Sequence, residues 1–600
     1  MLFRLPYVTS AYELAESMGA AQAATASEAM EEIKKRIARE KDRRELEVYY
    51  YRVGYTLSFP LPLARLPKVL PEPIPGFKYP WFTWLLWELK DRWDLLHIGW
   101  RRYGDEQAGL LLQQELAELS EWDNYKDYSG DVSLCTGHLA DCLAQYLAEE
   151  SGWESRYYQK AVAAATKLID QDVWPWYETS WMNQEITVKR MHNINCIILF
   201  GSAALAKVLR NAHESDLDNT ARMVFAKWME LGNSSNPHTE GVTYDGFLLE
   251  TVTDWMMALP DADALWQAAK EPLTMFVTAC QQLSLPGRPD LHAPLGDIEP
   301  EMPFWMTVIL RCAKKYDLPD VYWLLRRIPL VRLTTAALAE LAEEENSEEP
   351  NRTPESGGMI HPAAITLRTG WSNEDTLAAI SISRNEFGHL HCDGGHLVIG
   401  TNKRFWITDP GYQQYRPGFE QDYSLGVEAH NAPVIEGVSQ SRRAAKPLAA
   451  EVDAQGNLYA DMDLSLCYDH LPADTSVKRS VRLIPGQGAS IVVCDSIDSK
   501  QGPLQIGYHW LGGTYLAWAF HEGWARLSDG ELALWIKVIS GGEGVELTAD
   551  CLKRHEGTRG PLTLCHNLWI AEGKQQIYWV FHFQDSKVWN PPQHGITTIY

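Results

Sequence analysis

Four residues between positions 389 and 430 have the types and the spacing of a metal site beside a catalytic group. His389 and His391 lie in the segment HLHCDGGHLVIG, Asp409 follows the apolar run RFWIT, and His430 opens the segment HNAPVIEG. We expect His389 and His391 on one strand, where residues i and i+2 project to the same face. Two imidazoles and a carboxylate from neighbouring strands suit a divalent cation, and zinc best of all. The sequence therefore predicts a metal site that borders an active site.

Two further residues of the same segment compete as ligands. These are His396 and Asp393, and Asp393 in CDGG favours a role in shaping the turn. Manganese or another divalent ion is the alternative to zinc, and a set of histidines without metal is the alternative to any ion. Hydrolysis by a zinc-bound water also stays open, because three protein ligands leave one coordination position free.

Two polar segments stand out in the first half of the chain. KRMHNINCIILFGSAALA begins with His192, Asn193 and Asn195 ahead of an apolar helix, where amides usually cap the helix. The functional alternative is that Asn193 donates its NH2 group to a substrate carboxylate. In HTEGVTYDGFLLE, we expect Tyr244 in a glycine-flanked loop that enters a helix, with its phenol placed for proton transfer.

The elements that must position these residues change type along the chain. Residues 1–340 repeat apolar positions at i, i+3, i+4 and i+7, which predicts successive helices in a solenoid or toroid of helical hairpins. Residues 341–362 combine acidic residues with Pro and Gly and are typical of a linker. Residues 363–600 alternate with a period of two between turn residues, which predicts an antiparallel β-sandwich. The expected architecture is an all-helical domain followed by an all-β domain.

Composition narrows the classes of function. Of the 600 residues 45% are hydrophobic, and the net charge of −25 argues against nucleic acid as the main partner. The ten cysteines show no disulfide framework. The N-terminus lacks the pattern of a signal peptide. The sequence contains no run of 18 apolar residues, so we expect no membrane span. We expect a cytoplasmic protein, or a periplasmic or secreted one if a signal has been removed, and leave homo-oligomerisation open.

Taken together, the motifs resemble the heparinase II/III-like polysaccharide lyases. RMHNINCIILFGSAALA, EGVTYDGF, LHAPLGDIE, GHLHCDGGHLVIG, TDPGYQQY and AHNAPVIEG occur in the order seen in that family. The His-x-His-x-Asp-Gly-Gly segment with its following Asp-Pro-Gly and Tyr is the specific part. The resemblance implies an N-terminal incomplete (α/α) toroid joined to a C-terminal antiparallel β-sandwich, with catalysis between them.

The resemblance also implies roles for individual residues. Asn193 would neutralise the C5 carboxylate of a uronate, Tyr244 would serve as acid or base, and His389 would face it from the sandwich. The residues that match the metal ligands are His391, Asp409 and His430, and the ion would be mainly structural. His192 lies directly before the asparagine and is a further catalytic candidate.

Elimination explains why such groups are needed. An amide donor in a water-poor site could stabilise the charge that develops on the uronate carboxylate by about 3 kcal/mol, as oxyanion donors do. The reference pKa of histidine, ~6.5, suits a base better than the ~10 of tyrosine, so we assign His389 as the base and Tyr244 as the acid, or as both where stereochemistry requires it. Arg190, Arg384 and Tyr415 are candidates for binding the acidic substrate, beside Lys189 and Arg416.

The sequence thus predicts a lyase that acts on an acidic polysaccharide, with glycosaminoglycans such as heparan sulfate, hyaluronan or chondroitin sulfate favoured over alginate. A glycoside hydrolase on a helical toroid is one alternative, with Glu240, Asp245 and Asp254 as its carboxyl candidates. A carbohydrate-binding protein without catalysis is the other. Membrane and nucleic-acid partners are not expected.

Overall fold

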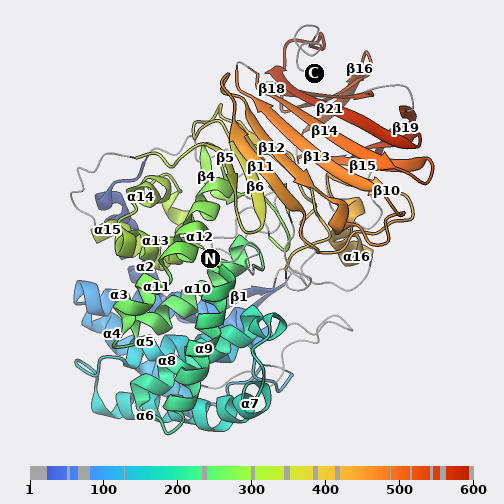
Figure 1. Ribbon diagram of the computed structural model, residues 1–600. Coiled ribbons are helices and arrows are strands. Elements are labelled where there is room, and N and C mark those ends of the chain that lie inside the picture. Colours follow the sequence, from blue (N-terminus) through green and yellow to red (C-terminus); the bar gives the residue numbers. More distant parts are fainter. Residues whose placement is uncertain are drawn as a thin grey trace.

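Helices fill the first half of the chain and strands the second, as the sequence predicts (Figure 1). The computed structural model describes residues 23–50, 55–64, 81–127, 129–232, 239–298, 305–343, 352–382, 389–411, 419–486, 488–513, 516–540, 545–553 and 563–592. None of the helices in these ranges combines the length and the apolar character that a bilayer crossing requires.

The helical half is built from helices of 7 to 23 residues that follow one another along the chain. Their bounds are α2 Ala26–Asp42, α3 Trp81–Tyr103, α4 Glu106–Glu118, α5 Leu134–Leu147, α6 Ser155–Lys167, α7 Trp174–Ser180, α8 Asn193–Leu209, α9 Glu214–Gly232, α10 Val242–Met257, α11 Ala262–Ala268, α12 Lys270–Leu283, α13 Met306–Tyr316, α14 Pro319–Leu325 and α15 Thr335–Glu343. Among the described helices, the last, α15, packs against the earliest, α2, so this succession closes on itself.

Two adjacent helices of this half approach unusually closely. A Cβ on Gly201 of α8 would lie 2.5 Å from the carbonyl oxygen of Gly137 of α5, and a Cβ on Gly137 would lie 2.8 Å from the Cα of Ile198. Any side chain at either position would force the two backbones apart. The glycines therefore fix the position of α8, whose first turn carries Asn193.

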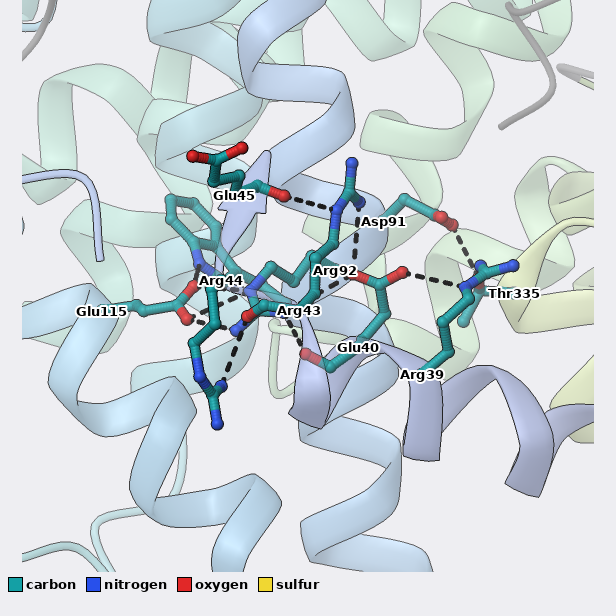
Figure 2. A network of polar contacts seen from close by, with 10 residues as sticks. Arg39, Glu40, Arg43, Arg44, Glu45, Asp91, Arg92, Glu115 and Thr335 are labelled. Atoms are coloured by element: carbon teal, nitrogen blue, oxygen red, sulfur yellow. Dashed lines mark hydrogen bonds and ion pairs between the residues drawn. The ribbon is translucent and has the colours of Figure 1, made fainter. Parts of the chain in front are cut away.

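A buried polar network ties the first helices together (Figure 2). The guanidinium of Arg92 on α3 binds both oxygens of Glu115 on α4 at 2.6–3.0 Å, and it also donates to the carbonyl oxygen of Glu40 on α2. Trp93 Nε1 donates to Glu115 at 3.0 Å. Because a buried charge is costly unless it is paired, this pairing favours one arrangement of the three helices.

The helical half also contains two β-hairpins that the sequence analysis did not predict. They are β1 Glu45–Tyr50 with β2 Tyr55–Pro60, and β3 Ser284–Leu285 with β4 Arg288–His292. Residues 261–282 are divided between two helices, α11 and α12, rather than forming one continuous helix. Pro272 lies in the first turn of α12, where its missing N–H costs no helical hydrogen bond.

The second half forms three antiparallel sheets. The first, in the order β5-β6-β7-β8-β9, has β5 Gly357–Ile360, β6 Ala364–Arg368, β7 Leu377–Ser381, β8 Leu397–Thr401 and β9 Arg404–Ile407. The second, β11-β12-β13-β14-β21-β18-β17-β16, has β11 Lys446–Val452, β12 Leu458–Asp463, β13 Ser476–Ile484, β14 Ser490–Ser499, β16 Ala517–His521, β17 Trp524–Ser528, β18 Leu532–Ser540 and β21 Gly573–Asp585. The third, β10-β15-β20-β19, has β10 Pro433–Ile435, β15 Leu504–Leu511, β19 Val545–Lys553 and β20 Thr563–Ile570. A short helix, α16 Phe419–Leu425, precedes β10.

One apolar core joins the three sheets into a layered domain. Alternate residues of the strands point inward, as the burial pattern of β13 shows, and Trp510, Trp579 and Phe581 pack edge to face within the core. Such contacts add to the burial of large aromatic surfaces. The predicted β-sandwich is therefore confirmed, and Figure 1 shows it lying beside the helical half.

A separate apolar cluster holds the two halves together. Leu285 and Leu291 from the β3–β4 hairpin pack with Leu377 and Phe405 of the first sheet. Arg368 on β6 reaches across and donates to the carbonyl oxygen of Gln282 at 3.0 Å. The hairpin thus anchors the helical half to the sandwich next to the segment that carries Asp297.

Candidate active site at the junction of the two halves

The first turn of α8 presents Asn193 towards the junction. His192 is the N-cap, and its Nδ1 accepts a hydrogen bond from the backbone N–H of Ile194 at 3.4 Å. Because His192 caps the helix, the side chain of Asn193 is available for other contacts. Burial lowers the pKa of His192 more than the nearby Glu240 raises it, so this ring is neutral at pH 7.

Glu240 fixes the orientation of Asn193. Its Oε1 accepts the backbone N–H of Asn193 at 2.9 Å, and its Oε2 accepts the side-chain NH2 at 2.7 Å. A carboxylate only accepts hydrogen bonds, so the contact identifies Nδ2 as the amide atom that faces Glu240. Glu240 and Asn193 are both buried. The pair therefore presents an amide of known orientation.

Tyr244 lies in the first turn of α10 rather than in the predicted loop. The helix begins at Val242, directly after Gly241, whose φ of +93° is a conformation that favours glycine. The helical position gives Tyr244 a fixed backbone.

His389 lies in a loop ahead of β8, so the prediction that His389 and His391 share a strand is wrong. The loop approaches the segment that follows β4. The backbone N–H of Asp297 donates to the carbonyl oxygen of His389 at 2.7 Å, and a Cβ on Gly296 would lie 2.4 Å from that same oxygen. Gly296, at a φ of +81°, permits this close approach.

Both ring nitrogens of His389 have polar partners. Nδ1 lies 3.0 Å from Oδ2 of Asp297, and Nε2 lies 3.0 Å from Nδ2 of Asn193. Because the carboxylate accepts and the amide nitrogen donates, the proton is on Nδ1 and the lone pair on Nε2. Burial raises the pKa of Asp297, but the hydrogen bonds with His389 and His391 lower it more, so the pKa lies below its usual range.

The phenol ring of Tyr244 lies flat against the imidazole of His389. Their centroids are 3.4 Å apart and their planes differ by 9°. The ring of His192 is 5.7 Å from that of His389. The structure thus brings Asn193, Tyr244, His389 and His192 together at the junction, as expected from the sequence. Side-chain exposures of 29% for His192 and 13% for His389 leave the group open to solvent.

The three predicted metal ligands also meet. One ligand atom from each of His391, Asp409 and His430 lies within 4.8 Å of the others, and all three residues are buried. Nδ1 of His430 lies 2.9 Å from Oδ2 of Asp409, whose Oδ1 accepts the N–H of Gly411 at 2.8 Å. The residues come from the loop before β8, the end of β9 and the segment before β10.

The donor chemistry fits a divalent cation. Nε2 of His391 contacts Asp297 at 2.8 Å, the arrangement by which a carboxylate typically orients a metal-bound histidine. Among the described residues, none hydrogen-bonds to the buried Nε2 of His430. Two imidazoles and one carboxylate are a ligand set typical of zinc. Whether an ion binds here, and which one, stays a prediction.

His396, a competing candidate, fits a supporting role better. Its Nδ1 accepts the backbone N–H of Asn431 at 2.8 Å, so in the neutral ring the proton is on Nε2. That nitrogen lies 3.2 Å from Oδ2 of Asp409. His396 therefore has no lone pair directed at the cluster; its Nε2 lies close to the carboxylate without forming a hydrogen bond to any described residue. Asp393 closes the predicted turn, since its carbonyl oxygen accepts the N–H of His396 at 2.8 Å.

Comparisons with known proteins agree with the predicted family. Residues 370–580 match the sequence model of the heparinase II/III-like C-terminal domain. The chain carries a heparinase II/III-like domain. The matched segment contains His389, His391, Asp409 and His430. The predicted recognition of this family is therefore confirmed for residues 370–580.

Solved structures resemble this heparinase-like chain over most of its length. The heparan sulfate lyase HepC from Pedobacter heparinus is 11% identical, with a TM-score of 0.57 over 93% of this chain and 84% of that one. A heparinase III with methylated lysines is 9% identical, with a TM-score of 0.54 over 94% of this chain and 85% of that one. A further heparinase III is 12% identical, with a TM-score of 0.51 over 83% and 77%. At these identities the likeness establishes the fold. No curated protein shows significant sequence similarity to the chain.

A second cluster in this heparinase-like chain also has the spacing of metal ligands. It comprises His192, Glu240 and His389. However, the NH2 group of Asn193 lies between Glu240 and His389 and donates towards both. A cation at the same place would repel this donor, so the cluster at His391, Asp409 and His430 is the better metal candidate.

The predicted substrate-binding residues have different outcomes. Arg190 lies near Asn193, but its guanidinium donates to the carbonyl oxygen of Ser180 and to Gln184 at 3.2 Å. Arg384 and Tyr415 fall outside the described residues, so their predicted roles stay predictions.

The carboxyl candidates for a glycoside hydrolase do not gather at the junction. Asp245 accepts hydrogen bonds from Thr239 and from the backbone N–H of Glu240 at 2.9 Å, and burial raises its pKa to about 7. Asp254 lies more than two turns further along α10 and binds Arg311 at 2.7 Å. Only Glu240 lies beside His389, where it binds Asn193.

Two residues of the heparinase-like site were not assigned these roles from the sequence. Glu240 was considered only as a hydrolase carboxylate, and Asp297 was part of the quoted motif LHAPLGDIE without a role. The signal for Asp297 is its glycine, because Gly296 marks a close backbone approach. Their partners are between 47 and 94 residues away in the chain, so spacing alone gives no sign of the contacts.

Proposed function

We propose that the protein cleaves a uronic-acid-containing polysaccharide by β-elimination and forms a 4,5-unsaturated uronate. The observation that carries the proposal is the meeting of an amide, a phenol and an imidazole at the junction, with Asn193 and Tyr244 from the helices and His389 from the sandwich. These are the three kinds of group that elimination needs: a carboxylate-neutralising donor, an acid and a base.

Asn193 neutralises the substrate carboxylate. Its NH2 group has two hydrogens, of which one is held by Glu240 and the other faces Nε2 of His389. When substrate binds, the C5 carboxylate replaces Nε2 as the acceptor of the second hydrogen, which stabilises the negative charge that develops there. A donor of this kind in a site poor in water contributes about 3 kcal/mol to the transition state.

His389 removes the C5 proton. Asp297 holds the imidazole in the tautomer with the proton on Nδ1, which leaves the lone pair on Nε2 as the acceptor. Once the NH2 group of Asn193 donates to the substrate carboxylate instead of to Nε2, this lone pair is free to accept the C5 proton. The electrons of the C5–H bond then form the C4–C5 double bond, and the C4–O4 bond breaks.

Tyr244 protonates the leaving O4 atom. Its fixed place in the first turn of α10 and the stacking of its ring on His389 keep the phenol beside the base. The acid and the base are in direct contact. This arrangement suits a substrate whose proton and leaving group are on adjacent carbons.

The residues that would hold a divalent ion are His391, Asp409 and His430. Bound there, the ion would link three segments of the sandwich and would supply structural support rather than a reactive water. Asp297 contacts both His389 and His391, so the predicted metal site and the base share one carboxylate. This contact supports a mainly structural role.

Glycosaminoglycans are the substrates we favour, because heparinase II/III-like proteins with this fold include a heparan sulfate lyase. Alginate is the alternative, since it shares the carboxylate on which the mechanism depends. The net charge of −25 means that an acidic chain must be received by local bases such as Arg190.

A digestion panel tests the proposal. The full chain, supplied with zinc, is incubated with heparan sulfate, hyaluronan, chondroitin sulfate and alginate, and ultraviolet absorbance of the unsaturated uronate is followed. Absorbance that rises with one of these polymers, and that is lost in Asn193→Ala, supports the proposal. Folded, zinc-loaded protein that produces no absorbance with any of them would overturn it.

A further inference from the structure

The helical half contains a large cavity away from the junction. Its volume is about 1130 Å³, and it is lined by residues of α3, α5, α8, α10, α13 and α15. The lining residues of α8 and α10 lie in the later turns of these helices, whereas Asn193 and Tyr244 lie in the first turns. At 1.5 Å per residue, Arg210 lies about 25 Å from Asn193 along α8, and Asp254 lies about 15 Å from Tyr244 along α10.

Asp141 on α5 lies at the floor of this cavity. Its side chain is buried, with 1% of the residue exposed, and no described residue hydrogen-bonds to either of its carboxyl oxygens. Buried polar atoms without a partner are rare in proteins because each one costs free energy. A hydroxyl group that enters from the cavity would satisfy this carboxyl.

A second carboxyl at the floor, that of Asp254, has a hydrogen bond at only one of its two oxygens among the described residues. Oδ1 of Asp254 accepts a hydrogen bond from Arg311 at 2.7 Å, but no described residue hydrogen-bonds to its buried Oδ2. Lys90, nearby, is paired with Asp94 at 2.8 Å. Burial raises the pKa of Asp141 well above its usual range, and it raises the pKa of Asp254 as well. A neutral carboxyl both donates and accepts hydrogen bonds, as a hydroxyl does.

The lining favours an organic ligand. The described groups that could hold a metal lie elsewhere, at the junction and in the sandwich. Apolar side chains, among them Ile98, Met257 and Leu310, lie beside the floor carboxyls. A mixture of apolar wall and a few convergent polar groups is typical of a ligand site, and the volume exceeds that of one sugar ring.

The mouth of the cavity is basic, but several of its cations are already paired. Arg102 binds Glu340 at 2.7 Å, and Lys207 binds Glu214 at 2.7 Å. Arg210 is exposed at the end of α8 in a left-handed conformation with a φ of +51°. Arg210 is among the residues that line the cavity, and a guanidinium is suited to bind a carboxylate or sulfate group with two hydrogen bonds.

We propose that this cavity is a second saccharide site, in which hydroxyl groups bind Asp141 and Asp254 while an acidic group binds Arg210. That the ligand carries hydroxyl groups and one acidic group is inferred from the lining residues alone. The choice of a uronate oligosaccharide as the ligand rests on the proposed function. The site would hold substrate or product away from the residues that cleave it.

Binding is measured on the full chain with Tyr244→Phe, so that the ligand is not consumed. The probe is an unsulfated tetrasaccharide of glucuronate and N-acetylglucosamine, and the neutral tetrasaccharide of N-acetylglucosamine and inorganic sulfate are the comparison ligands. Hydrogen exchange followed by mass spectrometry reports separately on the later turns of α5, α8 and α10 and on the junction. We expect the acidic tetrasaccharide to protect the later turns.

Three variants in the same background test the contacts. Asp141→Leu removes both polar atoms and should weaken binding at the cavity about tenfold or more, whereas Asp141→Asn keeps a donor and an acceptor and should bind nearly as well. Arg210→Gly suits the left-handed backbone, so it should leave folding intact while weakening the acidic ligand about tenfold. The neutral tetrasaccharide should bind equally with or without Arg210.

Other outcomes would overturn the proposal. Absence of protection in the later turns, equal protection by inorganic sulfate, or unchanged binding in Asp141→Leu and Arg210→Gly would each show a cavity that holds only water or an adventitious anion. Failure of the proposed function is a separate result, because it appears as absence of unsaturated product and of protection at Asn193, Tyr244 and His389.

Discussion

The phenol ring of Tyr244 and the imidazole of His389 are stacked, with centroids 3.4 Å apart and planes that differ by 9°. One ring comes from the first turn of a helix and the other from a loop of the sandwich, 145 positions later in the chain. Their contact therefore depends on how the two halves are docked. The β3–β4 hairpin and Gly296 set that docking.

Replacing Tyr244 with Phe should keep this stack and remove the only proton that the residue can donate. We expect the rate of elimination to fall about 100-fold to 10,000-fold, which is the usual contribution of a general acid. The melting temperature should change little, because the ring contacts remain. Initial rates by ultraviolet absorbance and thermal unfolding give both quantities. A variant that keeps more than about half of the activity would contradict the role of the phenol.

Glu240→Gln should disturb the orientation of Asn193 rather than the binding of substrate. The new amide can still accept one of the two hydrogen bonds from Asn193, but its NH2 group faces the other donor. We expect kcat to fall about tenfold or more while KM changes little, since an interaction made in the transition state is weakened. Steady-state kinetics measure the split.

Glu178→Gln is the matched control for that variant, because Glu178 is an exposed residue of α7 in the same half of the protein. It should behave as the unmodified chain does. A fall in kcat of equal size in both variants, or a change in KM alone for Glu240→Gln, would remove Glu240 from the account.

Much of the fold follows from the sequence because its signals are local. The apolar period of α8 and the alternation of β13 are each set within a few residues of the chain. The class of both halves and the meeting of Asn193, Tyr244 and His389 were predicted in this way and by resemblance to a family.

The errors concern contacts between distant segments. His389 was expected on a strand because HLHC alternates, but hydrogen bonding to Asp297 holds it in a loop. Tyr244 was expected in a loop because Gly241 precedes it, but that glycine is the N-cap of α10. In both cases a tertiary contact or a helix cap decides the conformation. Neither of these leaves a repeating apolar pattern in the sequence by which it could be predicted.

Metal removal tests the predicted site in the sandwich. We expect about one zinc per chain by elemental analysis, and a strong chelator should lower the melting temperature by about 10 °C, because an ion that binds only the folded state stabilises it. His430→Ala should lose the ion and should melt near the chelated protein.

His521→Ala is the control for the metal test, since His521 is an exposed histidine on β16 of the same domain. It should retain both zinc and stability. If His430→Ala binds as much zinc as the unmodified chain does, the ligands have been assigned wrongly.

Asp245 should make stability depend on pH. Burial raises its pKa from its ordinary value to about 7 in the folded protein, so the unfolded chain releases this proton first as the pH rises. The contribution is fully present below about pH 4 and is lost as the pH rises to about 7, by about 4 kcal/mol. Asp245→Asn should lose this part of the pH dependence in urea unfolding from about pH 5 to about pH 8. Asp131→Asn, at an exposed position, should keep it.

The reaction in water enriched in ¹⁸O tests elimination against hydrolysis most directly. The polymer that responds in the digestion panel is cleaved in this water, and the oligosaccharide products are weighed by mass spectrometry. Elimination breaks the C4–O4 bond without adding water. After correction for exchange of the reducing-end hydroxyl with solvent, measured on an uncleaved oligosaccharide, the products should contain no ¹⁸O, and each cut should leave one unsaturated uronate at the new non-reducing end. Products that carry ¹⁸O at a new chain end and lack the double bond would contradict the proposed lyase mechanism.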